Sequence, residues 1–315
     1  MPEQAAVYIL RPALHAFSPT TVSMAAKYST RLQIAKRDIN KAFQSLPTKV
    51  LKSEQIRQIL DDNREFWRLG NITFPQFVER MEENTPLREV RLEFPNRPVI
   101  RYCWGDVFPF ELAQSIDADG YFSHYTAVHL HGLTQQVPKV IYFNIEQSVR
   151  PGGGTLTQEG IKRAFQGRCR TSSNVAAYQD RTICQLNGGN TDNLGVEAQV
   201  APEGASQIRV TSIERTLIDA AVRPIYTGGV HQVLGAFVAA KERVSVNKLA
   251  AMLKKLGYTY PYHQAIGFYM QRADYRESQL ALLRKFPMKF DFYLDYALKD
   301  TERDSTWRMI IPKGF

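Results

Sequence analysis

The sequence predicts an α+β protein in two domains, and three observations support this fold class. Helical periodicity occurs three times within the first 85 residues and is followed by a segment with a period of two. After residue 105, strand-like and helix-like segments are mixed along the rest of the chain. The chain has 315 residues, of which 44% are hydrophobic, so it can bury two cores and is not disordered as a whole.

The N-terminal segment is expected to be a loosely structured leader over residues 1–28, because Pro2, Pro12 and Pro19 interrupt it. From about Ser29 the apolar residues recur every three to four positions. This spacing predicts a first helix that ends before Pro47.

Two shorter helices follow, separated by a connector over residues 66–71. Ser53 is the expected N-cap of the second helix. Thr73 and Gln76 have the spacing of a capping box and predict the start of the third helix. Pro75 fits its first turn, where the missing N–H costs nothing.

Alternating residues over 87–94 and 99–104, around a turn at 95–98, predict a β-hairpin. Three helices and then a hairpin is the order of a winged helix-turn-helix, so residues 29–105 are predicted to form this domain. Such a domain places one helix in the major groove of double-stranded DNA and the hairpin beside the backbone.

Phosphate and base-edge contacts need basic and polar side chains, and this domain offers several. The candidates are Lys52, Arg57, Arg64, Arg68, Thr73, Gln76, Arg80, Arg88, Arg91, Arg97 and Arg101. Residues 1–105 hold 16 Lys or Arg and 11 Asp or Glu, and the whole chain has a net charge of +9. This balance permits an anionic partner. Three acidic residues on the third helix (Glu79, Glu82 and Glu83) favour the alternative, a winged helix that docks onto a protein.

The second domain, residues 106–315, is predicted to be mixed α/β. Helices are expected at 121–133, 213–222, 230–241, 246–256 and 262–271, and strands at 139–145, 208–210 and 307–311. Ser212 or Thr211 is the expected cap of the helix at 213–222, and Pro224 ends it. Arg150-Pro151-Gly152-Gly153-Gly154 lacks the spacing of a phosphate-binding loop and is expected to be a turn.

Residue patterns in the second domain give no catalytic or metal site. The three histidines His124, His129 and His131 come without an HExxH motif or a paired cysteine cluster, so local hydrogen bonding is expected for them. Arg215 and Asp219 are four apart and are expected to pair on a helix. The three cysteines are too widely spaced for a disulfide framework. We expect no cofactor and no membrane span, and a cytoplasmic location.

Three segments carry a resemblance to a known family. These are Tyr121 to Leu133, Ser212 to Pro224 with Gly228-Gly229 behind it, and the ending that contains Phe290–Leu294 and Trp307–Pro312. In this order they are similar to the AbiEi family, the antitoxins and transcriptional regulators of abortive-infection (type IV) toxin–antitoxin systems. The resemblance covers about residues 29–315. Its motif positions in the second domain are His124, Tyr125, Thr126, Glu214, Arg215, Asp219 and Pro224.

The resemblance implies a cytoplasmic prokaryotic protein with two tasks and no enzymatic activity. Its winged domain would bind inverted repeats in its own promoter region and repress the operon. Its antitoxin domain would neutralise a cognate nucleotidyltransferase-like toxin without forming a stable complex. Two alternatives stay open: a DNA-binding regulator with a ligand-sensing second domain and no toxin, and a metal-dependent nuclease-like enzyme that uses Glu197, Glu214 or Asp219.

Overall fold

The computed structural model describes residues 19–148, 155–202, 204 and 206–315, with side chains from residue 31 onward. The chain divides into two compact units. The first is Met1–Glu89 with Tyr102–Gly105, and the second is Val90–Arg101 with Asp106–Phe315. Of the expected leader, residues 1–18 lie outside the described residues. Residues 19–28 form part of a helix and not the expected loose segment, because the helix already begins at Pro19.

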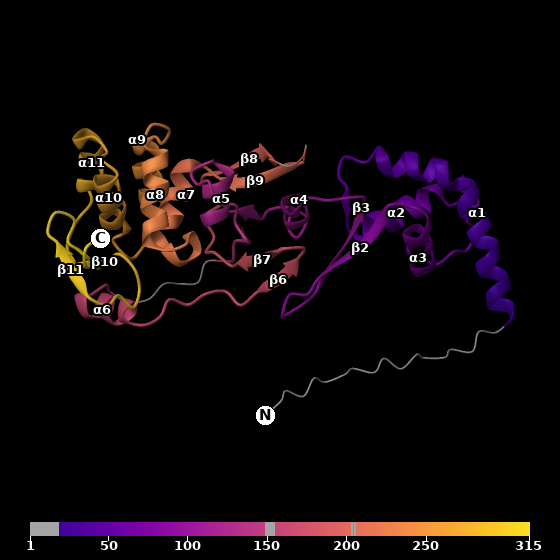
Figure 1. Cartoon of the computed structure of the whole chain (residues 1–315), viewed down its shortest axis with the longest axis horizontal. Helices are drawn as coiled ribbons and strands as arrows, with labels where there is room; N and C mark the ends of the chain where they lie inside the picture. The colour runs from indigo at the N-terminus through magenta and orange to yellow at the C-terminus, as the bar shows by residue number, and fades with distance from the viewer. Residues whose placement is uncertain (1–18, 149–154, 203, 205) are drawn as a thin grey trace, which may run out of the picture. The chain divides into compact units, whose positions relative to one another are not determined.

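Three helices build the first unit: α1 (Pro19–Gln44), α2 (Ser53–Asn63) and α3 (Phe74–Asn84) (Figure 1). Their apolar stripes are buried, as the periodicity predicts. Leu32, Ile39 and Phe43 of α1 are at most 2% exposed, and Phe77 and Met81 of α3 are fully buried. The N-cap of α2 is Lys52 and not the expected Ser53, because the side chain of Gln55 accepts a hydrogen bond from the backbone N–H of Lys52.

A three-stranded sheet completes this region, in the order β1-β3-β2. Strands β2 (Leu87–Leu92) and β3 (Val99–Trp104) are the predicted hairpin and confirm it. The two-residue strand β1 (Val50–Leu51) pairs antiparallel to β3, with Val50 opposite Cys103. It was not predicted, because two residues are too few to show a period.

The outer half of the hairpin, Val90–Arg101, groups with the second unit. Arg101 gives the physical reason. Its guanidinium is buried and donates hydrogen bonds to the carbonyl oxygens of Ser115 at 2.7 Å and Ile116 at 3.1 Å. Strand β3 is therefore held at Arg101 by residues that follow α4 (Pro109–Gln114).

A six-stranded mixed sheet is the centre of the second unit, in the order β6-β7-β5-β4-β9-β8. The strands are β4 (Tyr121–Phe122), β5 (Val140–Asn144), β6 (Val175–Tyr178), β7 (Arg181–Leu186), β8 (Val196–Val200) and β9 (Gln207–Thr211). The β5–β7 and β4–β9 pairs are parallel, whereas β4 and β5 are antiparallel. The parallel pairs bring together segments that lie about 40 and 90 residues apart in the sequence.

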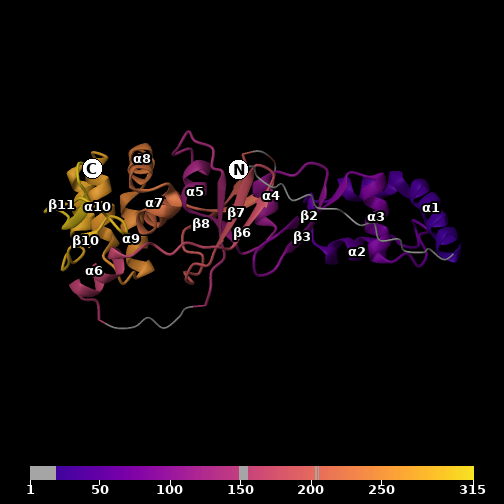
Figure 2. The ribbon, with the colours of Figure 1, turned by 60° about the horizontal axis from the view of Figure 1, so that its bottom comes forward.

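Helix α5 (His124–Leu130) contacts both β5 and helix α7 (Ile213–Val222), and so connects the sheet to a helical layer. That layer contains α8 (Val230–Ala240), α9 (Val246–Leu256), α10 (Tyr262–Arg272) and α11 (Glu277–Arg284), after a short 3₁₀ turn, η1 (Pro224–Thr227). Figure 2 shows α7 and α8 beside each other. The helices at 213–222, 230–241, 246–256 and 262–271 were predicted within a residue or so. Helices α4, α6 (Gln158–Gln166) and α11 were not.

The segment 121–133 was expected to be one helix, and this was wrong. Tyr121 and Phe122 form β4, Ser123 is the N-cap, and α5 begins at His124. The expected turn at residues 150–154 lies outside the described residues.

A small sheet near the C-terminus follows the order β10-β12-β11, with β10 (Phe292–Tyr293), β11 (Thr301–Asp304) and β12 (Met309–Pro312). It packs against α10 through Trp307, which is fully buried. A Cβ on Gly267 would lie 2.2 Å from this indole ring, so the α10 backbone approaches Trp307 closely only because residue 267 is glycine. No helix of the described chain is long and apolar enough to cross a membrane.

Candidate functional site

The connection from α2 to α3 in the first unit is a rigid turn. The Arg64 guanidinium donates hydrogen bonds to the carbonyl oxygens of Gly70 at 2.8 Å and Ile72 at 2.9 Å. Trp67 is 3% exposed and anchors the connection in the core. Arg64 was a candidate for phosphate contact, but its role here is to hold the turn.

The exposed face of α3 carries Gln76, Glu79, Arg80 and Glu83, as its period requires. The Oε1 atom of Gln76 accepts a hydrogen bond from the backbone N–H of Thr73 at 3.1 Å, so the predicted capping box forms in this direction. Arg80 pairs with Glu83 at 2.8 Å across an exposed surface. Such a pair contributes little to stability, and the Arg80 side chain can exchange partners at low cost.

The other basic candidates divide into two groups. Arg88 donates to the carbonyl oxygens of Glu82 and Thr85 at the end of α3, and Arg101 is committed to carbonyl oxygens near α4. Arg88 and Arg101 were both expected to contact DNA, and here their guanidinium groups bind backbone carbonyl oxygens, with Arg88 exposed and Arg101 buried. The other exposed candidates are Lys52, Arg57, Arg68 and Thr73 in the first unit and Arg91 and Arg97 in the hairpin.

Arg57 is held in place by an aromatic ring. Its guanidinium carbon lies 4.0 Å from the centroid of the Phe74 ring. This cation–π contact joins the middle of α2 to the first residue of α3. An exposed, pre-oriented guanidinium beside α3 is suited to a phosphate group.

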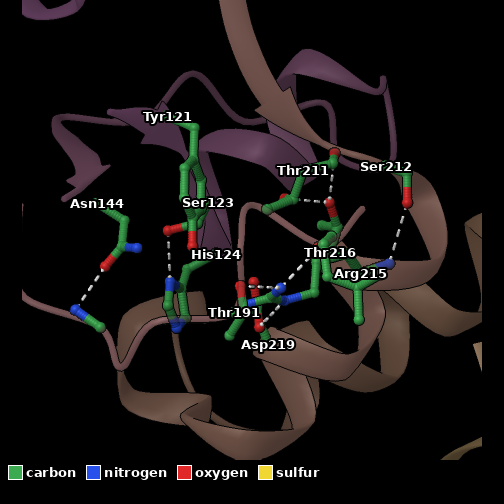
Figure 3. A network of polar contacts seen from close by, with 12 residues as sticks. Tyr121, Ser123, His124, Asn144, Thr191, Thr211, Ser212, Arg215, Thr216 and Asp219 are labelled. Atoms are coloured by element: carbon green, nitrogen blue, oxygen red, sulfur yellow. Dashed lines mark hydrogen bonds and ion pairs between the residues drawn. The ribbon is translucent and has the colours of Figure 1, made fainter. Parts of the chain in front are cut away.

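The second unit contains a cavity of about 590 Å³. Its wall is built from the β4–α5 junction, the end of β5, the loop after β7, α7 and η1 (Figure 3). Three of the seven family-motif positions line it: His124, Arg215 and Asp219. The cavity is therefore the second candidate site.

A buried ion pair forms one wall of this cavity. Arg215 Nε lies 2.8 Å from Asp219 Oδ1, and the two side chains are 6% and 8% exposed. Arg215 also donates to the Leu194 carbonyl at 2.7 Å and to Thr191 Oγ1 at 3.2 Å. Burial alone would lower the pKa of Arg215, but the Asp219 carboxylate together with Tyr121 and Tyr258 outweighs it, and the net shift is upward. The predicted pairing along α7 is confirmed.

Glu146 supports the same wall, and no pattern in the sequence pointed to this residue. Its carboxylate accepts hydrogen bonds from the Tyr121 hydroxyl at 3.0 Å, the Thr191 backbone N–H at 2.7 Å and the Thr191 hydroxyl. Burial would raise the pKa of Glu146, but these hydrogen bonds outweigh it and the pKa is lowered. Glu146 thus fixes the loop that carries Thr191, a partner of Arg215.

His124 occupies an unusual backbone position at the cavity wall. Its φ is +52°, in the left-handed region that bulky residues rarely adopt. Its Nδ1 atom shares a hydrogen bond of 2.9 Å with Ser123 Oγ, and its ring packs edge-on against Tyr226. Burial lowers the pKa of His124 to about 4, so the ring is neutral at pH 7. Strain of this kind is often found at binding sites.

The other four motif positions lie away from the cavity. Thr126 Oγ1 accepts from the Tyr142 N–H at 2.8 Å, and Glu214 accepts from the Ser245 N–H at 2.9 Å. The Tyr125 hydroxyl donates to Gln136, and Pro224 begins η1. These contacts are structural. Within the described part of the chain, no group of three or more His, Cys, Asp or Glu side chains could hold a metal ion.

The cavity also contains residues that were not predicted. Arg170 and Arg223 contribute further positive charge, and Asn144, Tyr226 and Tyr258 contribute amide and aromatic groups. They come from four separate stretches of the chain, and a single sequence has no pattern that connects them.

No protein-family model matches this chain, and no curated protein sequence matches it. Its structure is similar to the crystal structure of the RV2827C protein from Mycobacterium tuberculosis, with a TM-score of 0.58. The match covers 88% of this chain and 90% of that one, at 12% sequence identity. At this identity the similarity shows a shared fold and nothing about activity.

Proposed function

We propose that this protein is a DNA-binding antitoxin of the AbiEi kind, which represses its own operon and neutralises a nucleotidyltransferase-like toxin. The observation that carries the DNA-binding part is the arrangement of the first unit. In chain order, α1, β1, α2 and α3 of this unit come before the β2–β3 hairpin, whose outer half, Val90–Arg101, groups with the second unit; the sheet order is β1-β3-β2. This order resembles that of a winged helix-turn-helix, and on this basis we assign α3 as the recognition helix.

The surface of the first unit supports this assignment. Arg64 holds the α2–α3 turn, so α3 has a fixed orientation relative to α2. Arg80 lies on the exposed side of α3, and Arg57 is positioned next to that helix by Phe74. Glu79 and Glu83 on the same face oppose phosphate binding. We therefore propose that this face contacts DNA base edges and that the surrounding basic residues contact the DNA phosphates.

The antitoxin part rests on the resemblance of the second domain to the AbiEi family. The motif positions that line the cavity, His124, Arg215 and Asp219, identify the face of the second unit where we place this role. A DNA-binding regulator that senses a ligand through its second unit is the competing proposal, and the cavity is the observation that favours it.

Repression is tested with a reporter gene behind the native upstream region. The intact protein should lower reporter expression, and Arg80→Ala should relieve this repression while the protein stays folded and abundant. The matched control is Arg163→Ala, an exposed arginine of α6 in the second unit, which should repress as well as the unsubstituted protein. Equal repression by all three proteins would contradict the assignment of α3.

Neutralisation is tested by co-expression with the neighbouring toxin gene. The full chain should restore growth, and Arg80→Ala should restore it equally, because DNA binding and neutralisation are assigned to different units. Growth arrest that persists with abundant, folded protein would contradict the antitoxin role and favour the ligand-sensing regulator.

A further inference from the structure

The charge on the cavity wall of the second unit is unbalanced. Three arginines line the cavity, Arg170, Arg215 and Arg223, and the one lining carboxylate among the described residues is Asp219. Arg215 is already paired with that carboxylate. Within the part of the chain that the structure describes, Arg170 and Arg223 therefore line the cavity without a carboxylate as ion-pair partner.

Arg223 is the more informative of the two. It is half-buried, and its guanidinium donates to Cys169 Sγ at 3.1 Å and to the Tyr296 hydroxyl at 3.3 Å. No carboxylate of the described residues forms an ion pair with it. A partly buried cation costs free energy unless an anion or several hydrogen bonds compensate it, so Arg223 is suited to an anion from outside.

Aromatic and amide groups accompany these cations. The His124 and Tyr226 rings are in edge-to-face contact, with centroids 5.3 Å apart, and the Tyr226 hydroxyl is fixed by the Ser172 N–H at 2.8 Å. Asn144 is 5% exposed, and its Oδ1 accepts the Gly188 N–H at 2.9 Å. Its amide N–H groups make no hydrogen bond within the described chain, and Figure 3 shows this nitrogen on the side of Asn144 turned away from the bonded backbone N–H.

Size narrows the class of ligand. A cavity of about 590 Å³ lies within the range of small-molecule and cofactor sites, about 300–1,000 Å³. Guanidinium groups that lack a carboxylate partner bind phosphate, the face of an aromatic ring binds a base, and a buried amide donor can orient the base.

We propose that this cavity binds a mononucleotide, with its phosphate on Arg170 and Arg223 and its base against His124 and Tyr226. The second unit then responds to a small anionic ligand, which goes beyond DNA binding and toxin neutralisation. The proposal does not depend on either of those activities.

Calorimetric titration of the full chain tests this proposal. The ligands are AMP, GMP, CMP and UMP, with inorganic phosphate and adenosine as the two partial ligands. We expect saturable binding of at least one mononucleotide, and much weaker binding of phosphate and of the nucleoside. No binding of any mononucleotide at several millimolar, or equal binding of phosphate alone, would overturn the proposal. Binding of oligonucleotides only would also overturn it.

Substitutions locate the site. Arg223→Gln and Arg170→Gln should each weaken binding about 10- to 100-fold, the effect of losing a hydrogen bond to a charged group. Arg163→Gln, outside the cavity, is the control and should bind normally. Because Arg223 also contacts Cys169 and Tyr296, its variant could lose stability. Arg170 is exposed and makes no such contact with the described residues, so unchanged affinity in Arg170→Gln would contradict the assigned phosphate position.

Discussion

Replacing Asp219 with asparagine should destabilise the second unit strongly. The substitution keeps the shape of the side chain but removes its charge. Arg215 would then remain buried at 6% exposure with neutral acceptors alone, namely the Leu194 carbonyl, Thr191 Oγ1 and the amide oxygen that replaces Asp219 Oδ1. Removing one member of a buried ion pair leaves the other charge uncompensated, and this costs about 3–5 kcal/mol.

Equilibrium urea unfolding at pH 7, followed by circular dichroism, measures this loss. The matched control is Asp274→Asn, which removes the exposed partner of Lys241 and should leave the midpoint unchanged. The double variant Arg215→Met/Asp219→Asn should lose less than the sum of the two single variants, because neither charge is left alone. A loss of less than about 1 kcal/mol for Asp219→Asn would refute the inference that this pair is buried and essential.

Two further predictions concern stability. Gly267→Ala should cost roughly 1–3 kcal/mol, because its Cβ would overlap the Trp307 ring, whereas Gly235→Ala in α8 has free space and should gain up to about 1 kcal/mol. Scanning calorimetry compares them, and shifts of the same sign would contradict the packing described here. Since burial lowers the pKa of His124 from 6.5 to about 4, the unfolded chain takes up a proton over this window that the folded chain does not. The free energy of unfolding should therefore fall by up to about 3 kcal/mol as the pH drops from 6.5 to 4. Asparagine tolerates the left-handed backbone, so His124→Asn should make the free energy of unfolding depend less on pH over this range. Urea midpoints at pH 4.5 and 7 measure the change, and an unaltered slope in His124→Asn would contradict it.

Elements with a strong local signal could be predicted from the sequence. Thr73 and Gln76 marked the start of α3, and Ser212 marked the start of α7, where its Oγ accepts the Arg215 N–H at 3.3 Å. The helices that were missed are short, and β4 consists of two residues that continue directly into α5 through Ser123. Their formation depends on strands that are distant in the sequence, and periodicity does not report such pairing.

In the candidate sites, too, contacts between residues close in the sequence could be predicted and contacts between distant residues could not. The Arg215–Asp219 pair lies within one helix, so its spacing predicted it. Glu146, Arg170 and Arg223 reach the cavity region only because the sheet places β5, β7 and α7 together. Arg88 and Arg101 bind backbone carbonyl oxygens, and this role could not be predicted. The sequence alone does not distinguish a basic hairpin residue that contacts phosphate from one that binds the backbone of its own chain.

DNA binding through α3 is the central claim, and fluorescence anisotropy with the native upstream DNA and a scrambled duplex tests it most directly. We predict preferential binding to the native sequence across a series of salt concentrations. Arg80→Ala or Gln76→Ala should reduce this preference by about 1–3 kcal/mol. Arg97→Ala should reduce the slope of log affinity against log salt concentration by about one. Glu83→Gln should tighten binding to both duplexes, because it removes a negative charge. Equal affinity for both duplexes, unchanged by any of these substitutions, would contradict the claim and leave the first unit as a protein-docking module.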